Sequence, residues 1–169
     1  IDSEAAVMTD PTPSQTSVAG SVIRKMPIRQ RIDWLMDHAR LHSMGFQSPE
    51  AFLSRSRYIA QHPTATFAFS CMDGRINISV ATGVPPGIIV PFRNLGGRFD
   101  LGWPHFGEVL AEHIGGVVEK GRCALALITY HYSKGDSHRG CAGFGYNSDA
   151  ARNHAFEIKR QMEIRSEEH

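Results

Sequence analysis

The fold of this chain is decided by residues 70–75, Ser-Cys-Met-Asp-Gly-Arg, which directly follow the strand-like segment 64–69. In α/β proteins, the loops that follow strands carry much of the chemistry. The alternation of extended backbone predicts that Cys71, Asp73 and Arg75 lie on one side. A soft metal ligand, a carboxylate and a guanidinium on one face indicate a functional site. A buried structural cysteine beside a surface ion pair remains the alternative.

A second strand-like run, residues 123–130, ends directly before His131, and Cys141 follows a short distance later. Together with Cys71, these residues offer two thiolates and one imidazole at the ends of two strands. Zinc favours this mixture of ligands, and three protein ligands leave a fourth tetrahedral position for water. The spacing is only moderately specific, because the cysteines do not form a CxxC pair.

Strand-like and helix-like segments alternate along the chain, which predicts an α/β fold with a parallel sheet of at least three strands. Helical periodicity begins near Ile28, near Phe106 and after Ser148, and Ser48-Pro49 is a typical helix start. The predicted strands are 64–69, 87–92 and 123–130. We expect the 64–69 strand to lie between the other two, which would bring the loops after it and after 123–130 together.

The composition excludes several function classes. The net charge of +1 gives no electrostatic case for nucleic acid or an anionic membrane, and no apolar run approaches the length of a membrane span. We also find no signal peptide at the start of the chain. Three cysteines without disulfide-framework spacing indicate a reducing, cytoplasmic compartment, and Cys123 is expected to fill the core.

We expect three regions along the 169 residues. Residues 1–25 are rich in Ser, Thr, Pro and Ala and are interpreted as a flexible arm. Residues 26–62 are expected to form a small helical segment. Residues 63–169 would then form the zinc-binding catalytic domain, with the rest of its sheet on the C-terminal side expected either from further sequence or from another subunit.

The motifs resemble those of the β-class carbonic anhydrases. That family carries Cys-x-Asp-x-Arg after its first strand, which matches Cys71, Asp73 and Arg75 here. Residues 93–97, Arg-Asn-Leu-Gly-Gly, look like the family's Arg-Asn-Ala-Gly loop. The resemblance covers about residues 63–160, and it implies a β-carbonic-anhydrase-like parallel sheet flanked by helices.

The third motif departs from the family pattern of His-x-x-Cys directly after a strand. His138 keeps the spacing to Cys141, whereas His131 keeps the position at the strand end. The longer interval from His131 is similar to that of the divergent carboxysome shell branch. We favour His131 as the ligand because strands fix side chains better than a glycine-containing loop does. His138 is then expected to move protons near the metal.

The resemblance implies a zinc carbonic anhydrase, in which zinc-bound hydroxide converts carbon dioxide reversibly to bicarbonate. Asp73 would orient the bound water, and Arg75 would hold Asp73 off the metal. Weaker candidates for the substrate pocket or proton transfer are Arg93, Asn94, Gly96 and His138. Alternatives are a zinc enzyme that hydrolyses carbon disulfide or carbonyl sulfide, and a non-catalytic zinc scaffold.

The resemblance also implies partners and a location. A homo-oligomer is expected, because the sheet would otherwise expose a parallel edge. The shell branch implies a place inside a bacterial carboxysome, with the shell or Rubisco as possible partners.

Overall fold

The computed structural model describes residues 22–167, which divide into two compact units with a boundary between Ser48 and Pro49. Each unit is described by itself. Most of the arm expected over 1–25 lies outside the described residues, and its last residues, 22–25, are helical. No helix in the described part of the chain is both long enough and apolar enough to cross a membrane.

The first unit contains the helix α2, Ile28–Phe46, which runs for 19 residues and confirms the helix expected from Ile28. Pro27 precedes it, in agreement with the preference for proline at helix starts. The helix runs through Gly45 to Phe46, and a hydrogen bond from the Gln47 N–H to the Ser43 carbonyl closes it.

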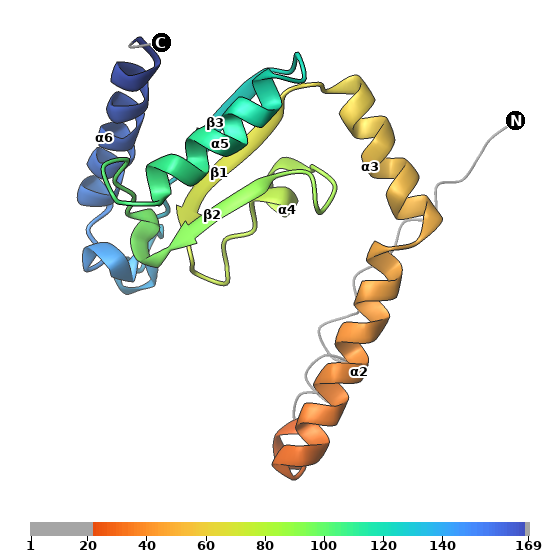
Figure 1. Ribbon diagram of the computed structural model, residues 1–169. Helices are drawn as coiled ribbons and strands as arrows, with labels where there is room; N and C mark the ends of the chain where they lie inside the picture. Colours follow the sequence, from red (N-terminus) through yellow and green to blue (C-terminus); the bar gives the residue numbers. More distant parts are fainter. Residues whose placement is uncertain (1–21, 168–169) are drawn as a thin grey trace, which may run out of the picture. The chain divides into compact units, whose positions relative to one another are not determined.

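The second unit is built on a parallel sheet of three strands in the order β2-β1-β3 (Figure 1). The central strand β1 is Ala65–Cys71, and its neighbours are β2, Val90–Asn94, and β3, Ala124–Ile128. The predicted parallel α/β fold and the predicted strand order are therefore confirmed. Because β1 and β3 are parallel neighbours, their carboxyl-terminal ends lie beside each other at one end of the sheet.

Helices and short 3₁₀ turns precede, connect and follow the strands. The helices of this unit are α3, Pro49–Gln61; α4, Ile78–Thr82; α5, Phe106–Val118; and α6, Ser148–Glu167. The 3₁₀ turns are η1, Leu95–Gly97; η2, Ser137–Arg139; and η3, Ala142–Phe144. The expected starts of α3, α5 and α6 agree with the structure.

Two local details differ from the sequence prediction. The link after Cys71 contains the short helix α4, which was not expected; the Asn77 side chain caps it by accepting the Val80 N–H. Helical periodicity was expected to begin after Ser148, but α6 includes Ser148, and its capping side chain is Asn147, whose oxygen accepts the N–H of Ala150 at 2.9 Å. Both caps satisfy N–H groups that a helix leaves unpaired at its start.

The core lies between one face of the sheet and the helices α5 and α6, both of which contact β3. Its buried members are Phe67, Phe69, Phe99, Leu101, Leu110 and Ile158. Phe69 stacks on Phe92 with 5.1 Å between ring centroids and meets Phe99 and Phe106 edge to face. Burying such a side chain stabilises the fold by about 1.5–3 kcal/mol. The strand that supplies Phe67 and Phe69 also supplies Cys71, so the core fixes the position of Cys71.

Candidate metal centre

Cys71 is the last residue of β1 rather than the first residue of a loop, because the strand runs two residues beyond its predicted end at Phe69. Its side chain is buried, and pairing with β2 continues past it through the hydrogen bond from Met72 N–H to Asn94 O. Gly97 lies against its backbone, so that a Cβ there would approach the Cys71 nitrogen to 3.1 Å. The thiol is therefore held by rigid elements on two sides.

β3 ends at Ile128, two residues before its predicted end at residue 130, so His131 follows the strand by three residues rather than directly. Thr129 ties this segment to the central strand. Both the N–H and the hydroxyl of Thr129 donate to the Phe69 carbonyl, each at 3.0 Å. Burial lowers the pKa of His131, although the Asp73 carboxylate acts in the opposite direction. The Nε2 atom of His131 is buried without a hydrogen-bond partner. A buried polar atom of this kind is costly unless something binds it.

Cys141 directly precedes η3 and is buried. The turn η3 packs closely on η1, because a Cβ at Gly143 would lie 2.5 Å from the Gly96 Cα. Only glycine permits this approach, which carries Cys141 toward the end of β1. Sequence analysis did not identify Gly143, since its close contact is with a residue far away in the sequence.

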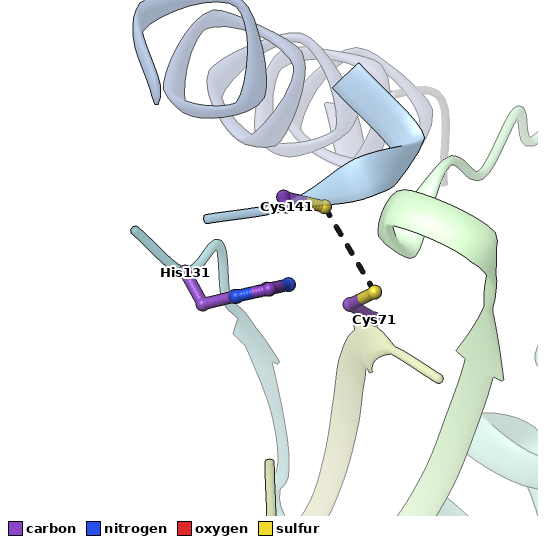
Figure 2. A group of neighbouring side chains, drawn as sticks. All are labelled: Cys71, His131 and Cys141. Atoms are coloured by element: carbon purple, nitrogen blue, oxygen red, sulfur yellow. Dashed lines mark hydrogen bonds between the residues drawn. The ribbon is translucent and has the colours of Figure 1, made fainter. Parts of the chain in front are cut away.

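The structure brings Cys71, His131 and Cys141 together, and their ligand atoms all lie within 4.8 Å of one another. Figure 2 shows the three side chains pointing toward a common point, with the Cys141 thiol donating to the Cys71 sulfur at 3.9 Å. Two thiolates bound tetrahedrally to one zinc at about 2.3 Å would lie roughly 3.8 Å apart. The sulfur separation, the unpartnered imidazole nitrogen and the Cys2His donor set all fit a zinc ion.

Backbone N–H groups point at both sulfurs. Gly96 N–H donates to the Cys71 Sγ at 3.3 Å, and the N–H groups of Gly143 and Phe144 contact the Cys141 sulfur. Burial nevertheless raises the pKa of the Cys141 thiol, and the nearby Cys71 raises it further. A bound cation would offset this effect, because metal coordination deprotonates a thiol. The three N–H groups then stabilise the thiolates.

Asp73 and Arg75 form a bidentate ion pair beside these residues. The Arg75 Nε donates to Asp73 Oδ1 at 2.9 Å, and its Nη2 donates to Oδ2 at 2.5 Å. The Arg75 backbone N–H donates to Oδ1 as well. These hydrogen bonds hold the pKa of Asp73 far below its usual range, and the positive charge of Arg75 adds a smaller effect. Asp73 is therefore ionised, with both oxygens engaged by Arg75.

The weaker candidates Arg93, Asn94 and Gly96 all lie near Cys71. The Arg93 guanidinium donates to the carbonyl oxygens of Cys71, Asp73 and Ile76, at distances from 2.7 to 3.2 Å. Arg93 thus fixes the loop that carries Asp73. The Asn94 amide donates to the Arg98 carbonyl, and its Oδ1 is buried without a partner.

His138 lies apart from the two cysteines. Its ring is exposed in η2, where its Nδ1 lies 3.9 Å from the Asp136 carboxylate and its centroid lies 5.6 Å from that of Tyr146. Within the described residues, it does not belong to the group that could hold a metal ion. The geometry therefore groups His131, rather than His138, with Cys71 and Cys141.

Comparison with known proteins gives limited information. No protein-family model matches the chain, and a search of curated proteins finds no significant match. Among solved structures, the structure of this chain is similar to the structure of the beta-carbonic anhydrase CcaA, with a TM-score of 0.42 and 16% sequence identity. The match covers 80% of this chain and 65% of that chain. The functional argument therefore rests on the residues of this chain.

Proposed function

We propose that this protein is a zinc-dependent carbonic anhydrase that interconverts carbon dioxide and bicarbonate. The observation that carries the proposal is the convergence of Cys71, His131 and Cys141 beside the Asp73–Arg75 pair. The similarity of the surrounding motifs to those of the β-class supports carbon dioxide as the substrate. The described residues supply three ligands to this group rather than four, which favours a catalytic zinc over a closed structural one.

Cys71, His131 and Cys141 would hold the zinc. When bound, zinc lowers the pKa of a coordinated water to about 7 and so provides a nucleophile for carbon dioxide at neutral pH.

Asp73 accepts a hydrogen bond from the attacking water and orients it. Oδ1 already accepts two Arg75 donors, Nε and the backbone N–H, whereas Oδ2 accepts Nη2 and only a shared contact from Nε at 3.2 Å, which leaves Oδ2 as the acceptor for the water. The bidentate contact also keeps Asp73 from reaching toward the metal as a fourth ligand. Because its pKa lies far below neutrality, Asp73 is a poor proton carrier. The released proton would leave instead through the imidazole of His138, whose side chain is exposed.

The decisive experiment measures carbon dioxide hydration by stopped flow in the zinc-loaded protein, with carbonyl sulfide and carbon disulfide as alternative substrates. We expect activity toward carbon dioxide that Cys71→Ser and Cys141→Ser abolish together with zinc binding. Cys123→Ser is the matched control, because this third cysteine is exposed, contrary to the expectation that it fills the core, and lies outside the group. A zinc-loaded protein without activity toward carbon dioxide would contradict the proposal. Activity toward the sulfur compounds alone would identify the related hydrolase instead.

We further propose that the protein acts as an oligomer inside a carboxysome, in contact with the shell or Rubisco. The interval between His131 and Cys141 supports the carboxysome assignment through its similarity to the shell branch. Light scattering tests the oligomer, and a fluorescent fusion expressed with carboxysomes tests the location. A monomer at micromolar concentration and a diffuse signal would contradict the two parts separately.

A further inference from the structure

The helix α2 carries Trp34, His38 and His42 in one row, with each residue four positions after the previous one. Residues at this spacing lie on the same face of a helix, one turn apart. All three side chains are exposed. The Trp34 ring stacks on the His38 ring with 5.1 Å between centroids and an interplanar angle of 10°.

The two imidazoles face each other through the same ring atom. Their Nε2 atoms lie 3.1 Å apart, and the rings meet edge to face at 4.5 Å. Two imidazole nitrogens bound to one metal ion at about 2.0–2.1 Å, with an angle of 90–109° between them, lie roughly 2.9–3.4 Å apart. The observed separation of the Nε2 atoms falls within this range, so little rearrangement is needed for chelation.

We propose that His38 and His42 form a second metal site, which chelates a late first-row divalent cation such as Zn²⁺, Ni²⁺ or Cu²⁺. Neutral imidazole suits these ions, and water would fill the remaining coordination positions. In the absence of metal, one ring donates a hydrogen bond to the other. Chelation replaces that hydrogen bond and requires both rings in the tautomer that leaves Nε2 free.

This site differs in chemistry from the candidate centre at Cys71. It has no thiolate and only two protein ligands, so it holds metal more weakly and exchanges it more readily. It lies on α2 alone, which belongs to the other compact unit of the chain. The inference therefore does not depend on carbonic anhydrase activity.

The stacked Trp34 provides a direct readout. The chain has two tryptophans, so Trp103→Phe leaves Trp34 as the sole indole emitter. The experiment loads this variant with one equivalent of zinc and then titrates it with Ni²⁺, a paramagnetic quencher, while Trp34 fluorescence is recorded. Zinc content after dialysis shows whether the first site stayed filled.

We expect saturable quenching of Trp34, because the ion binds to His38, whose ring stacks on the Trp34 ring. His42→Ala in the same background removes one ligand and should weaken Ni²⁺ binding by at least about 10-fold. Losing a residue that only hydrogen-bonds to a metal ligand already costs about 10–100-fold in metal affinity, so losing a ligand should cost at least the lower of these values. His62→Ala is the matched control; this exposed histidine contacts the Tyr58 ring on a different helix. Circular dichroism verifies that the variants keep their helix content.

Saturable quenching in the parent and in the His62 variant, together with weakened quenching in the His42 variant, supports the site. Quenching that rises linearly with Ni²⁺, or that is equal in the His42 and His62 variants, overturns it. Ni²⁺ binding to protein that already holds zinc also distinguishes the His38–His42 site from the candidate centre at Cys71. If zinc never loads, the titration is performed on the metal-free protein, and the same comparison of variants decides.

Discussion

His131 and His138 differ in what surrounds each imidazole. His131 is half-buried, and its Nε2 lacks a partner, whereas His138 is exposed beside Asp136. An imidazole that binds a metal must be neutral and must present a free nitrogen toward the ion. Burial lowers the pKa of His131 and so favours its neutral form. These differences make the two histidines separable by substitution.

We expect His131→Ala to lose zinc, because only the two thiolates would remain. His138→Ala should retain zinc and lose rate, and added imidazole buffer should restore part of that rate if the ring carries protons. Metal analysis after dialysis and stopped-flow assays in two buffers measure both effects. Zinc retained in the first variant and lost in the second would reverse the assignment.

Asp73 shows how a neighbour sets a protonation state. Its pKa is depressed mainly by hydrogen bonds from Arg75, so the ionised carboxylate contributes stability above the unfolded-state value of about 3.9. That contribution is lost only as the pH falls through the lower folded-state pKa. Arg75 thus extends the pH range over which Asp73 remains an acceptor.

Arg75→Ala should raise the pKa of Asp73 toward its ordinary value of about 3.9. NMR titration of the Asp73 carboxyl carbon measures this shift in the folded protein. Arg75→Lys should give an intermediate result, since an ammonium cannot reproduce the planar fork. An unchanged pKa in the alanine variant would show that the hydrogen bonds do not control Asp73.

Asp73→Asn should keep zinc and slow turnover by on the order of 10²-fold, as expected for the loss of one preorganised hydrogen-bonding group. Asp149→Asn, an exposed residue in the first turn of α6, is the control and should leave the rate unchanged. Metal content and kcat are compared in the same preparations. A full rate in the Asp73 variant would exclude an orienting role for this carboxylate.

Among the elements, the contact between η1 and η3 decides where Cys141 lies. The backbone of Gly143 lies against Gly96, whose own N–H donates to Cys71. The two turns therefore link both sulfurs through a glycine-to-glycine contact. A side chain inserted there would push the turns apart and separate the sulfurs.

Gly143→Ala should destabilise the protein by about 1–3 kcal/mol, the usual cost of overpacking, and should weaken zinc binding. Gly115→Ala is the matched control, because a Cβ on this helical residue of α5 meets no atom within 4 Å. That change should be neutral or slightly stabilising, since alanine favours helix. Denaturant unfolding and metal titration measure both variants. Equal stability of the two would contradict the importance of the contact.

At the scale of the molecule, the candidate ligands come from three separate segments of the second unit. They are the end of β1, the segment after β3 and the start of η3. An ion bound to all three would connect parts of the chain that are far apart in sequence. Metal binding is then linked to folding, because the unfolded chain lacks the assembled site.

Removing zinc with a chelator should lower the melting temperature by on the order of 10 °C. This follows from about 4 kcal/mol of stabilisation at a free zinc concentration 1,000 times the Kd, and about 2–4 °C per kcal/mol for a domain of this size. Thermal unfolding under reducing conditions with and without chelator measures the shift. Cys123→Ser should show the same shift, and Cys71→Ser should show none. A chelator effect in the Cys71 variant would place the stabilising ion elsewhere.

The amino-acid sequence by itself determined the α/β class, the strand order and the chemical types of the candidate ligands. Hydrophobic periodicity and turn residues are local signals, and parallel strands joined by helices have few possible arrangements. The ends of individual elements were less predictable: β1 continues to Cys71, and α4 forms where no helix was expected.

Only the tertiary structure decided which side chains meet. The motif spacing left His131 and His138 as alternatives, and the structure groups His131 with Cys71 and Cys141. The close approach of Gly143 to Gly96 and the hydrogen bonds from Arg93 to the Cys71 loop likewise had no signal in the sequence. Each of these contacts joins segments that are distant along the chain. Their geometry depends on how the sheet, its turns and the core pack together, which local patterns do not specify.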